Sequence, residues 1–126
     1  MHTMRSTMLN AFLDEVAEPG GGFLSPHRMS RALRMPLSEL SRVTHLHRNT
    51  LARKPQSDRV QARLGEIARI IALASELVGD SDRAIIWFRH QPLAGFDRKT
   101  AEELVAAGHG HAVLKHLEML TEGGYA

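Results

Sequence analysis

Residues 57–80 read "SDRVQARLGEIARIIALASELVGD", and this stretch decides the fold class. Apolar residues recur in it every three or four positions, at Val60, Leu64, Ile67, Ile71, Ala74 and Val78. That spacing predicts one face of an α-helix of about 20 residues, roughly 30 Å long. Ala68, Ile70 and Leu73 widen the apolar stripe. The helix is therefore expected to be buried on more than one side, as the central column of the domain, as a dimer interface, or as both.

The rest of the chain also carries helical patterns. Proline and glycine divide it into short segments, and none shows sustained apolar–polar alternation or an Asn-Gly or Asp-Gly hairpin signal. We therefore predict an all-α fold. Residues 1–56 are expected to hold a first helix and a helix-turn-helix, and residues 57–126 a small helical domain around the long helix. Helices are predicted at about 6–18, 26–35, 37–43, 47–54, 58–78, 83–89, 100–107 and 111–121.

Local signals mark where these helices begin and end. The expected N-caps are Ser25, Pro36 or Ser38, Ser57 or Asp58, Asp80 or Ser81, and Asp97 or Thr100. Thr100 with Glu103 three residues later fits a capping box. Gly79 and Gly108 are expected helix ends, because glycine adopts the left-handed conformation that often terminates a helix.

Charge is distributed unevenly along the chain, although the net charge is only +2. Residues 25–59 hold eight basic and two acidic residues, whereas residues 60–126 hold seven basic and nine acidic residues. A concentrated positive field favours nucleic acid as a partner, and the acidic part favours a protein; a solvated basic face is the alternative. The absence of cysteine excludes disulfides, and no apolar run could span a membrane, so we expect a cytoplasmic protein.

The predicted helix-turn-helix lies within "SRVTHLHRNTLARKP", residues 41–55. Leu46 and Leu51 are expected to face inward, and His45 is the candidate for a left-handed residue in the turn. Arginine suits guanine, asparagine suits adenine, and the flanking basic residues suit phosphates. The predicted DNA contacts are Arg42, His47, Arg48, Asn49, Thr50, Arg53 and Lys54. In the alternative interpretation, these helices are only a packing layer.

Signals for catalysis and for metal binding are weak. The histidine pairs of "HLH" (residues 45–47) and "HGH" (residues 109–111) are two apart, so on a helix they point in different directions. Neither pair has a neighbouring cysteine or a His-Glu-x-x-His frame. No nucleophile elbow or phosphate-binding loop is present. We therefore predict no metal, no cofactor and no enzymatic activity.

The last part of the chain contains an ordered set of features. A tryptophan helix comes first, followed by a Gln-Pro-Leu bend, a capped helix, a glycine break, a leucine-rich helix and a glycine-aromatic end. These correspond to Trp87, residues 91–95, residues 100–104, residues 108–110, Leu114, Leu117, Leu120 and residues 122–125. Across residues 58–126 this order resembles the C-terminal toxin-binding domain of the Xre/MbcA/ParS antitoxins. The sequence departs from that pattern at Lys99-Thr100-Ala101, where a proline is usual, and at its Gly-His-Gly break.

The resemblance implies an antitoxin of a type II toxin–antitoxin pair. Its partner would be a RES-domain toxin, which consumes NAD, and the antitoxin would occlude the toxin's active site. Many members of the family also repress their own operon through the helix-turn-helix. A homodimer within a larger complex is expected, and the alternative function is a stand-alone dimeric helix-turn-helix repressor.

Residues expected to contact the toxin lie on the tryptophan helix, on the last helix and in the tail. They are Trp87, Phe88, Arg89, Lys115, Glu122, Gly123, Gly124, Tyr125 and Ala126. Two glycines make the tail pliable, so Tyr125 is expected to stack in a nucleotide cleft while the carboxylate of Ala126 pairs with arginines. The alternative is a frayed end with no partner.

Overall fold

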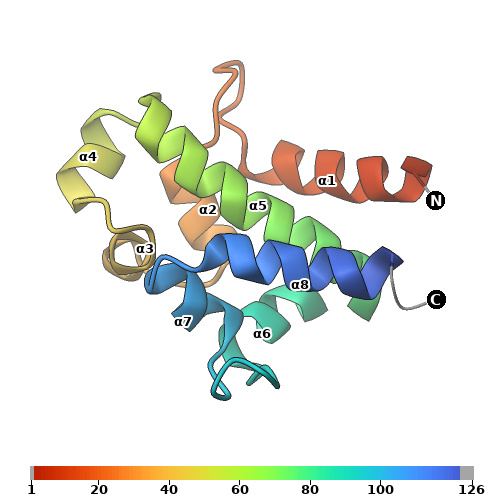
Figure 1. Ribbon diagram of the computed structural model, residues 1–126. Helices are drawn as coiled ribbons and strands as arrows, with labels where there is room; N and C mark the ends of the chain where they lie inside the picture. Colours follow the sequence, from red (N-terminus) through yellow and green to blue (C-terminus); the bar gives the residue numbers. More distant parts are fainter. Residues whose placement is uncertain (1, 123–126) are drawn as a thin grey trace.

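The computed structural model describes residues 2–122, with side chains from residue 9 onward. Within this range the protein is all-α, as predicted, and has no strand (Figure 1). Its helices are α1 (His2–Val16), α2 (Pro26–Ala32), α3 (Leu37–Thr44), α4 (Arg48–Arg53), α5 (Asp58–Val78), α6 (Ser81–His90), α7 (Ala101–Ala106) and α8 (Gly110–Glu122). The predicted tail contacts at residues 123–126 lie outside the described residues.

Helix α5 packs against three other helices, α1, α6 and α8 (Figure 1). All of its predicted stripe is buried except Val78, which is partly buried, and the widening residues Ala68, Ile70 and Leu73 are buried too. Burial on several sides explains why the sequence pattern is too wide for a surface helix. The prediction of a central column is thus met within one chain, and α5 keeps an exposed strip that includes Ala62, Arg69 and Leu77.

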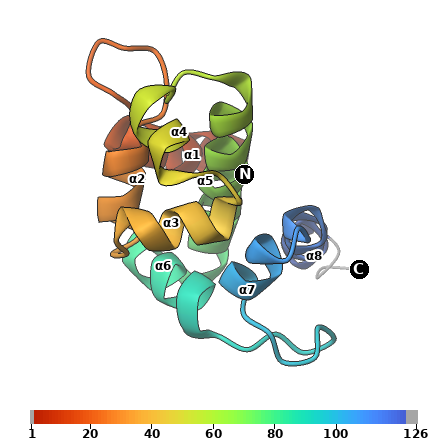
Figure 2. The ribbon, with the colours of Figure 1, turned by 90° about the vertical axis from the view of Figure 1, so that its left-hand side faces the viewer.

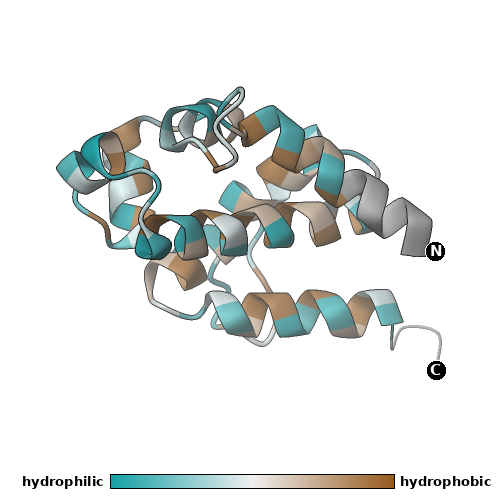
Figure 3. Ribbon diagram, turned by 90° about the horizontal axis from the view of Figure 1, so that it is seen from above, coloured by the Kyte–Doolittle hydropathy of each residue, from teal (hydrophilic) through white to brown (hydrophobic). Residues whose placement is uncertain are grey.

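The buried side chains form one hydrophobic cluster. It runs from Phe12 on α1 through Leu40 on α3 and Ile67 on α5 to Leu117 on α8. Figure 3 shows brown and teal bands alternating along the helices, as amphipathic helices packed on a shared core require. Residues from both predicted parts, 1–56 and 57–126, therefore belong to one core.

Most of the local signals are confirmed. The side chains of Ser25, Ser57 and Asp80 each accept a hydrogen bond from the first turn of their helix, and Gly79 ends α5. Thr100 and Glu103 form both bonds of the capping box. Helix α3 begins at Leu37 after Pro36 as the N-cap residue, with no side-chain cap, so Ser38 has no capping role.

Three expectations need correction. Helix α2 ends at Ala32 rather than near Met35, and Arg34 just beyond it adopts the left-handed conformation, with φ 59°. Helix α1 ends at Val16 rather than near Glu18, because the chain turns back and pairs Ala17 with Leu24 in an isolated antiparallel bridge. Leu120 was expected on the apolar side of the last helix but is exposed, since α8 continues past the end of the core that holds Leu117.

Replacing Thr100 with alanine is expected to destabilise the protein by about 1 kcal/mol at neutral pH, a typical value for a lost N-cap. The hydrogen bonds from Thr100 hold the pKa of the exposed Glu103 carboxyl below its usual value. A lowered pKa contributes stability above the unfolded pKa and loses it as the pH falls through the folded one. Alanine keeps the backbone N–H bond to Glu103, which is the larger cause of the lowered pKa, and loses only the side-chain bond, so the deficit of Thr100→Ala should shrink only slightly in acid, as measured by urea unfolding at several pH values.

Ser38→Ala is the matched control for this experiment. Ser38 is an exposed first-turn residue that caps nothing, so its loss should change the free energy of unfolding by less than about 0.5 kcal/mol. Equal losses for the two variants at neutral pH would contradict a stabilising role for the capping box.

Candidate functional site

The segment from α3 to α4 forms two short helices joined by a tight turn. His45 adopts the left-handed conformation in this turn, with φ 58° and ψ 33°, as the sequence predicts. Leu46 and Leu51 are buried and hold α4 against the core. Both views place α4 at the periphery of the molecule (Figures 1 and 2). The core thus anchors one side of α4 and leaves the other side open.

The open side of α4 is polar and basic. His47, Arg48, Asn49, Arg53 and Lys54 are exposed. Thr50 is only partly exposed. In the described part of the chain, no carboxylate pairs with the basic residues of α4. The nitrogen Nδ1 of His47 caps α4 by accepting a hydrogen bond from the backbone of Asn49 at 3.1 Å, so His47 has a structural role as well.

Arg42 differs from the other predicted DNA contacts. Its guanidinium lies 3.6 Å from the carboxylates of both Glu39 and Glu102, although its side chain is more than half exposed. Two nearby carboxylates offset its positive charge, so Arg42 is a weaker candidate for a phosphate contact than the residues of α4.

Arg42 belongs to a group of four charged side chains, which we call the Arg89 cluster: Arg42, Glu39, Arg89 and Glu102. Arg89 on α6 lies at its centre and donates hydrogen bonds of 2.9 Å to Glu39 on α3 and to Glu102 on α7. Its Nη1 also donates to the carbonyl of Arg34, at 2.7 Å, just beyond the end of α2. One guanidinium therefore ties together the segments around α2, α3, α6 and α7.

The centre of the Arg89 cluster is largely shielded from water, with side-chain exposures of 19% for Arg89 and 10% for Glu102, whereas Arg42 at its edge is 59% exposed. Burial lowers the pKa of Arg89, but the hydrogen bonds and charges of Glu102 and Glu39 outweigh it and raise that pKa above its ordinary value. Burial raises the pKa of Glu102, and the hydrogen bond and charge of Arg89 offset this only in part. The cluster thus depends on a permanently charged arginine.

The structure separates the residues predicted to contact a toxin. Phe88 is fully buried, so its side chain stabilises the core and does not reach the surface. Arg89 keeps 19% of its side chain exposed and is bound to Glu39 and Glu102. Trp87 is partly buried against the core. Lys115 and Glu122 are exposed on α8. The prediction for Phe88 conflicts with its burial, because the sequence alone does not show which side of α6 faces inward. The contact predicted for Arg89 stays a prediction.

The structure exposes large apolar side chains whose exposure was not predicted from the sequence. In the part of the chain with described side chains, these are Leu77, Ile86, Met119 and Leu120, on α5, α6 and α8. Ile86 is 52% exposed and Met119 69% exposed. Because Ile86 lies within an unbroken apolar run, Ala84 to Phe88, periodicity gave no sign that it faces outward.

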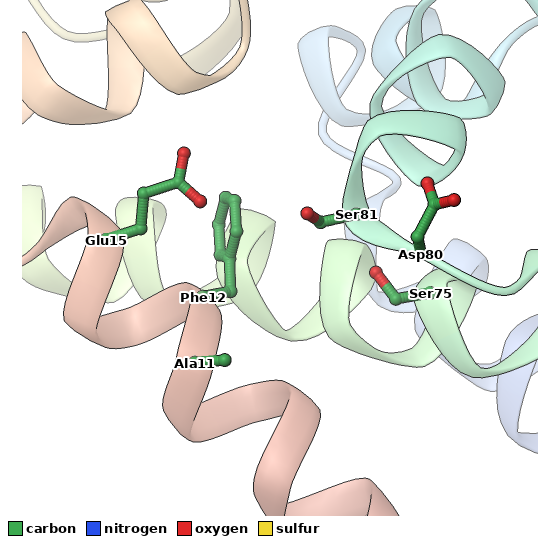
Figure 4. A pocket seen from close by; sticks show the side chains of 6 residues that line it. All are labelled: Ala11, Phe12, Glu15, Ser75, Asp80 and Ser81. Atoms are coloured by element: carbon green, nitrogen blue, oxygen red, sulfur yellow. The ribbon is translucent and has the colours of Figure 1, made fainter.

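A small hollow between α1 and the start of α6, about 150 Å³ in volume, offers no catalytic arrangement. Figure 4 shows Glu15 and Phe12 on one side of it and Asp80 and Ser81 on the other. Asp80 caps α6, and the Ser75 hydroxyl donates to the carbonyl of Ile71 at 2.7 Å. The hollow therefore lacks a paired nucleophile and base.

Searches of the described residues gave two further negative findings. No group of three or more histidine, aspartate or glutamate side chains there could hold a metal ion. No helix there has the length and apolar character needed to cross a membrane.

No protein-family model matches the chain, and searches of curated proteins and of solved structures also found no match. A functional proposal therefore has to come from the arrangement of the residues and from the resemblance seen in residues 58–126.

Proposed function

We propose that this chain is an antitoxin with two working surfaces. Its helix-turn-helix, α3 and α4, binds operator DNA, and helices of the second part bind and neutralise a RES-domain toxin. The proposal is supported by the fact that exposed basic and exposed apolar side chains lie on different helices. Unpaired basic side chains gather on α4, whereas the exposed large apolar side chains lie on α5, α6 and α8.

The DNA half of the proposal rests on α4. Arg48 and Arg53 are exposed and free of carboxylates, so they can contact guanine, and Asn49 can contact adenine. Lys54 at the end of the helix suits a phosphate. With six residues, α4 is a short reading helix, so few base contacts are expected and backbone contacts should carry much of the affinity.

The double substitution Arg48→Ala/Arg53→Ala is expected to weaken binding to operator DNA by at least about 30-fold, because each base contact is worth about 1–3 kcal/mol. Fluorescence anisotropy with the DNA upstream of the gene, at several salt concentrations, measures the loss. Arg83→Ala/Arg98→Ala is the control, since it removes the same charge from exposed positions outside α3 and α4. Unchanged DNA affinity in the first variant would mean that α4 is not the reading helix.

The toxin half of the proposal rests on the apolar exposure and on the resemblance. Ile86 and Met119 are large apolar side chains that are exposed on α6 and α8, and a partner protein that covers them would bury apolar area. Trp87 lies next to Ile86 in the sequence and keeps part of its ring accessible. A toxin held on this surface could receive residues 123–126 in its NAD cleft, which would block substrate entry.

Co-expression with a RES-domain protein encoded beside this gene tests the toxin half. The two proteins should copurify, and NAD consumption should stop at equal concentrations. Ile86→Glu/Met119→Glu should weaken the complex at least tenfold and leave DNA binding unchanged, because both residues lie outside α3 and α4. Ala62→Glu, at an exposed position of α5, is the control.

The alternative function gives a different result in the same experiment. If operator DNA binds but the neighbouring RES-domain protein neither copurifies nor loses activity, the chain acts as a stand-alone dimeric helix-turn-helix repressor. Deleting residues 123–126 separates binding from blocking. The truncated chain should still copurify with the toxin but should no longer stop NAD consumption.

A further inference from the structure

Three arginines on and just after α2 follow one another at intervals of three, Arg28, Arg31 and Arg34. Side chains three residues apart on a helix lie on the same face. All three line one open cavity of about 300 Å³, together with Ala32, with Glu15 from α1 and with Asp82 from α6. None of them belongs to the reading helix, and the proposed DNA contacts leave this cavity without a role.

Arg34, the third arginine of the cavity, adopts a backbone conformation that is unfavourable for most residues other than glycine. Arg34 has φ 59°, in the left-handed region where glycine or asparagine is the usual residue after a helix. Its carbonyl accepts from Arg89 at 2.7 Å, so the conformation is held by the Arg89 cluster. An arginine at this position keeps a third guanidinium over the cavity, where a glycine would relieve the strain.

Most of the guanidinium N–H groups in the cavity have no acceptor. Arg28 donates one hydrogen bond, to the carbonyl of Ala17 at 3.4 Å, and Arg34 donates one, to Asp82 at 3.1 Å. The side chain of Arg31 makes no hydrogen bond or ion pair with any described residue. Glu15, the second carboxylate of the cavity, also pairs with none of these arginines. Each guanidinium has five donors, so the site has many donors and few acceptors.

Asp82 competes only weakly with an anion for the guanidinium N–H groups of these arginines. It and Arg34 are both more than half exposed, and exposed ion pairs contribute little to stability. Asp82 also lies in the first turn of α6, where the helix dipole favours a negative charge with or without Arg34. A doubly charged phosphate group can therefore replace Asp82 on Arg34 and use the open donors of Arg31 and Arg28.

We propose that the cavity lined by Arg28, Arg31 and Arg34 is a binding site for a phosphate group. Guanidinium groups match the geometry of phosphate oxygens and are the usual residues for holding them. The phosphate belongs either to a small free ligand or to the backbone of the DNA bound by α4, and only the second source rests on the proposed function. In Figure 2, α2 lies at the outer side of the molecule, and Arg31 and Arg34 are exposed, so either source of phosphate can reach them.

The test uses the full chain and sodium pyrophosphate as the probe for a small ligand. Binding is followed by isothermal titration and by amide and arginine Nε shifts in NMR spectra. Arg28→Gln/Arg31→Gln should weaken pyrophosphate binding at least tenfold, whereas Arg63→Gln/Arg98→Gln, an equal loss of charge at exposed positions outside the cavity, should change it less than twofold. Asp82→Asn should tighten binding severalfold, a gain that partial unfolding could not produce.

A second arm measures operator DNA binding against salt concentration. If the phosphate comes from the DNA backbone, Arg28→Gln/Arg31→Gln should reduce the slope of log affinity against log salt by about 0.9 for one lost phosphate contact. The Arg48→Ala/Arg53→Ala variant should lose DNA but keep pyrophosphate, which separates this site from the proposed function. If the cavity variants change neither pyrophosphate binding nor the salt slope, the arginines are a solvated face and the proposal is wrong.

Discussion

Replacing Arg89 with methionine should destabilise the protein by about 3 kcal/mol, toward the lower end of the range for breaking a buried ion pair. The lower end applies because the Arg89 side chain retains 19% exposure. Methionine keeps the length of the side chain but leaves Glu39 and Glu102 without the 2.9 Å hydrogen bonds that compensate their burial. Urea unfolding followed by circular dichroism measures the loss.

Arg83→Met is the matched control on the same helix. Arg83 is largely exposed, and its Nε lies 3.8 Å from the carboxylate of Asp80, so its loss should change the free energy of unfolding by about 0–1 kcal/mol. Similar effects of Arg83→Met and Arg89→Met would show that the Arg89 cluster contributes no more than a surface pair.

The Arg89→Met variant should also respond differently to pH. Burial already raises the pKa of Glu102 in the native protein, and the loss of Arg89 should raise it further. A raised pKa means that the folded state takes up a proton first, so stability is gained as the pH falls through the folded pKa toward the unfolded value. The deficit of the variant should therefore be smaller at mildly acidic pH than at pH 7, and Glu102→Gln should restore part of its stability at pH 7.

The second large effect is expected for Phe88→Ala, with a loss of about 3–5 kcal/mol. Phe88 is fully buried and is among the largest side chains in the core, so alanine leaves a cavity that its neighbours cannot fill. Thermal and urea unfolding measure the loss. Trp87→Ala, on the partly exposed neighbour, should cost clearly less.

Phe88→Leu distinguishes a core role from a contact role. Leucine keeps most of the buried volume, so this variant should fold and should bind a toxin as the native protein does. Loss of toxin binding by a stably folded Phe88→Leu variant would contradict the burial and restore Phe88 as a contact residue. Weak binding by Phe88→Ala alone would report only the loss of the fold.

The Arg89 cluster also explains why the two proposed surfaces belong to one structure. Glu39 and Arg42 lie on α3, the first helix of the proposed reading unit, while Arg89 and Glu102 lie on α6 and α7. A ring nitrogen of His45, in the turn before α4, also contacts the carbonyl of Ala106 at the end of α7. The position of the α3–α4 segment is thus held by helices of the second part.

The sequence alone determined the helices and most of their ends, although not the ends of α1 and α2. A helix boundary depends on residues within about four positions of one another, so Ser57, Gly79 and the Thr100–Glu103 capping box could be predicted. The left-handed turn at His45 and the inward side of Leu46 follow from the same short range. The exposed basic residues of α4 could be predicted for this reason, since the buried leucines fix which side faces outward.

Only the tertiary structure decided which side chains of α6 and α8 are exposed. Arg89 resembles a surface residue in the sequence, yet its partner Glu39 lies 50 positions away and no local pattern connects them. Ile86 and Phe88 lie in the same apolar run, but packing against the shared core buries one and exposes the other. The physical reason is that local hydrogen bonds and periodicity fix a helix, whereas burial depends on the neighbours that the rest of the chain brings to it.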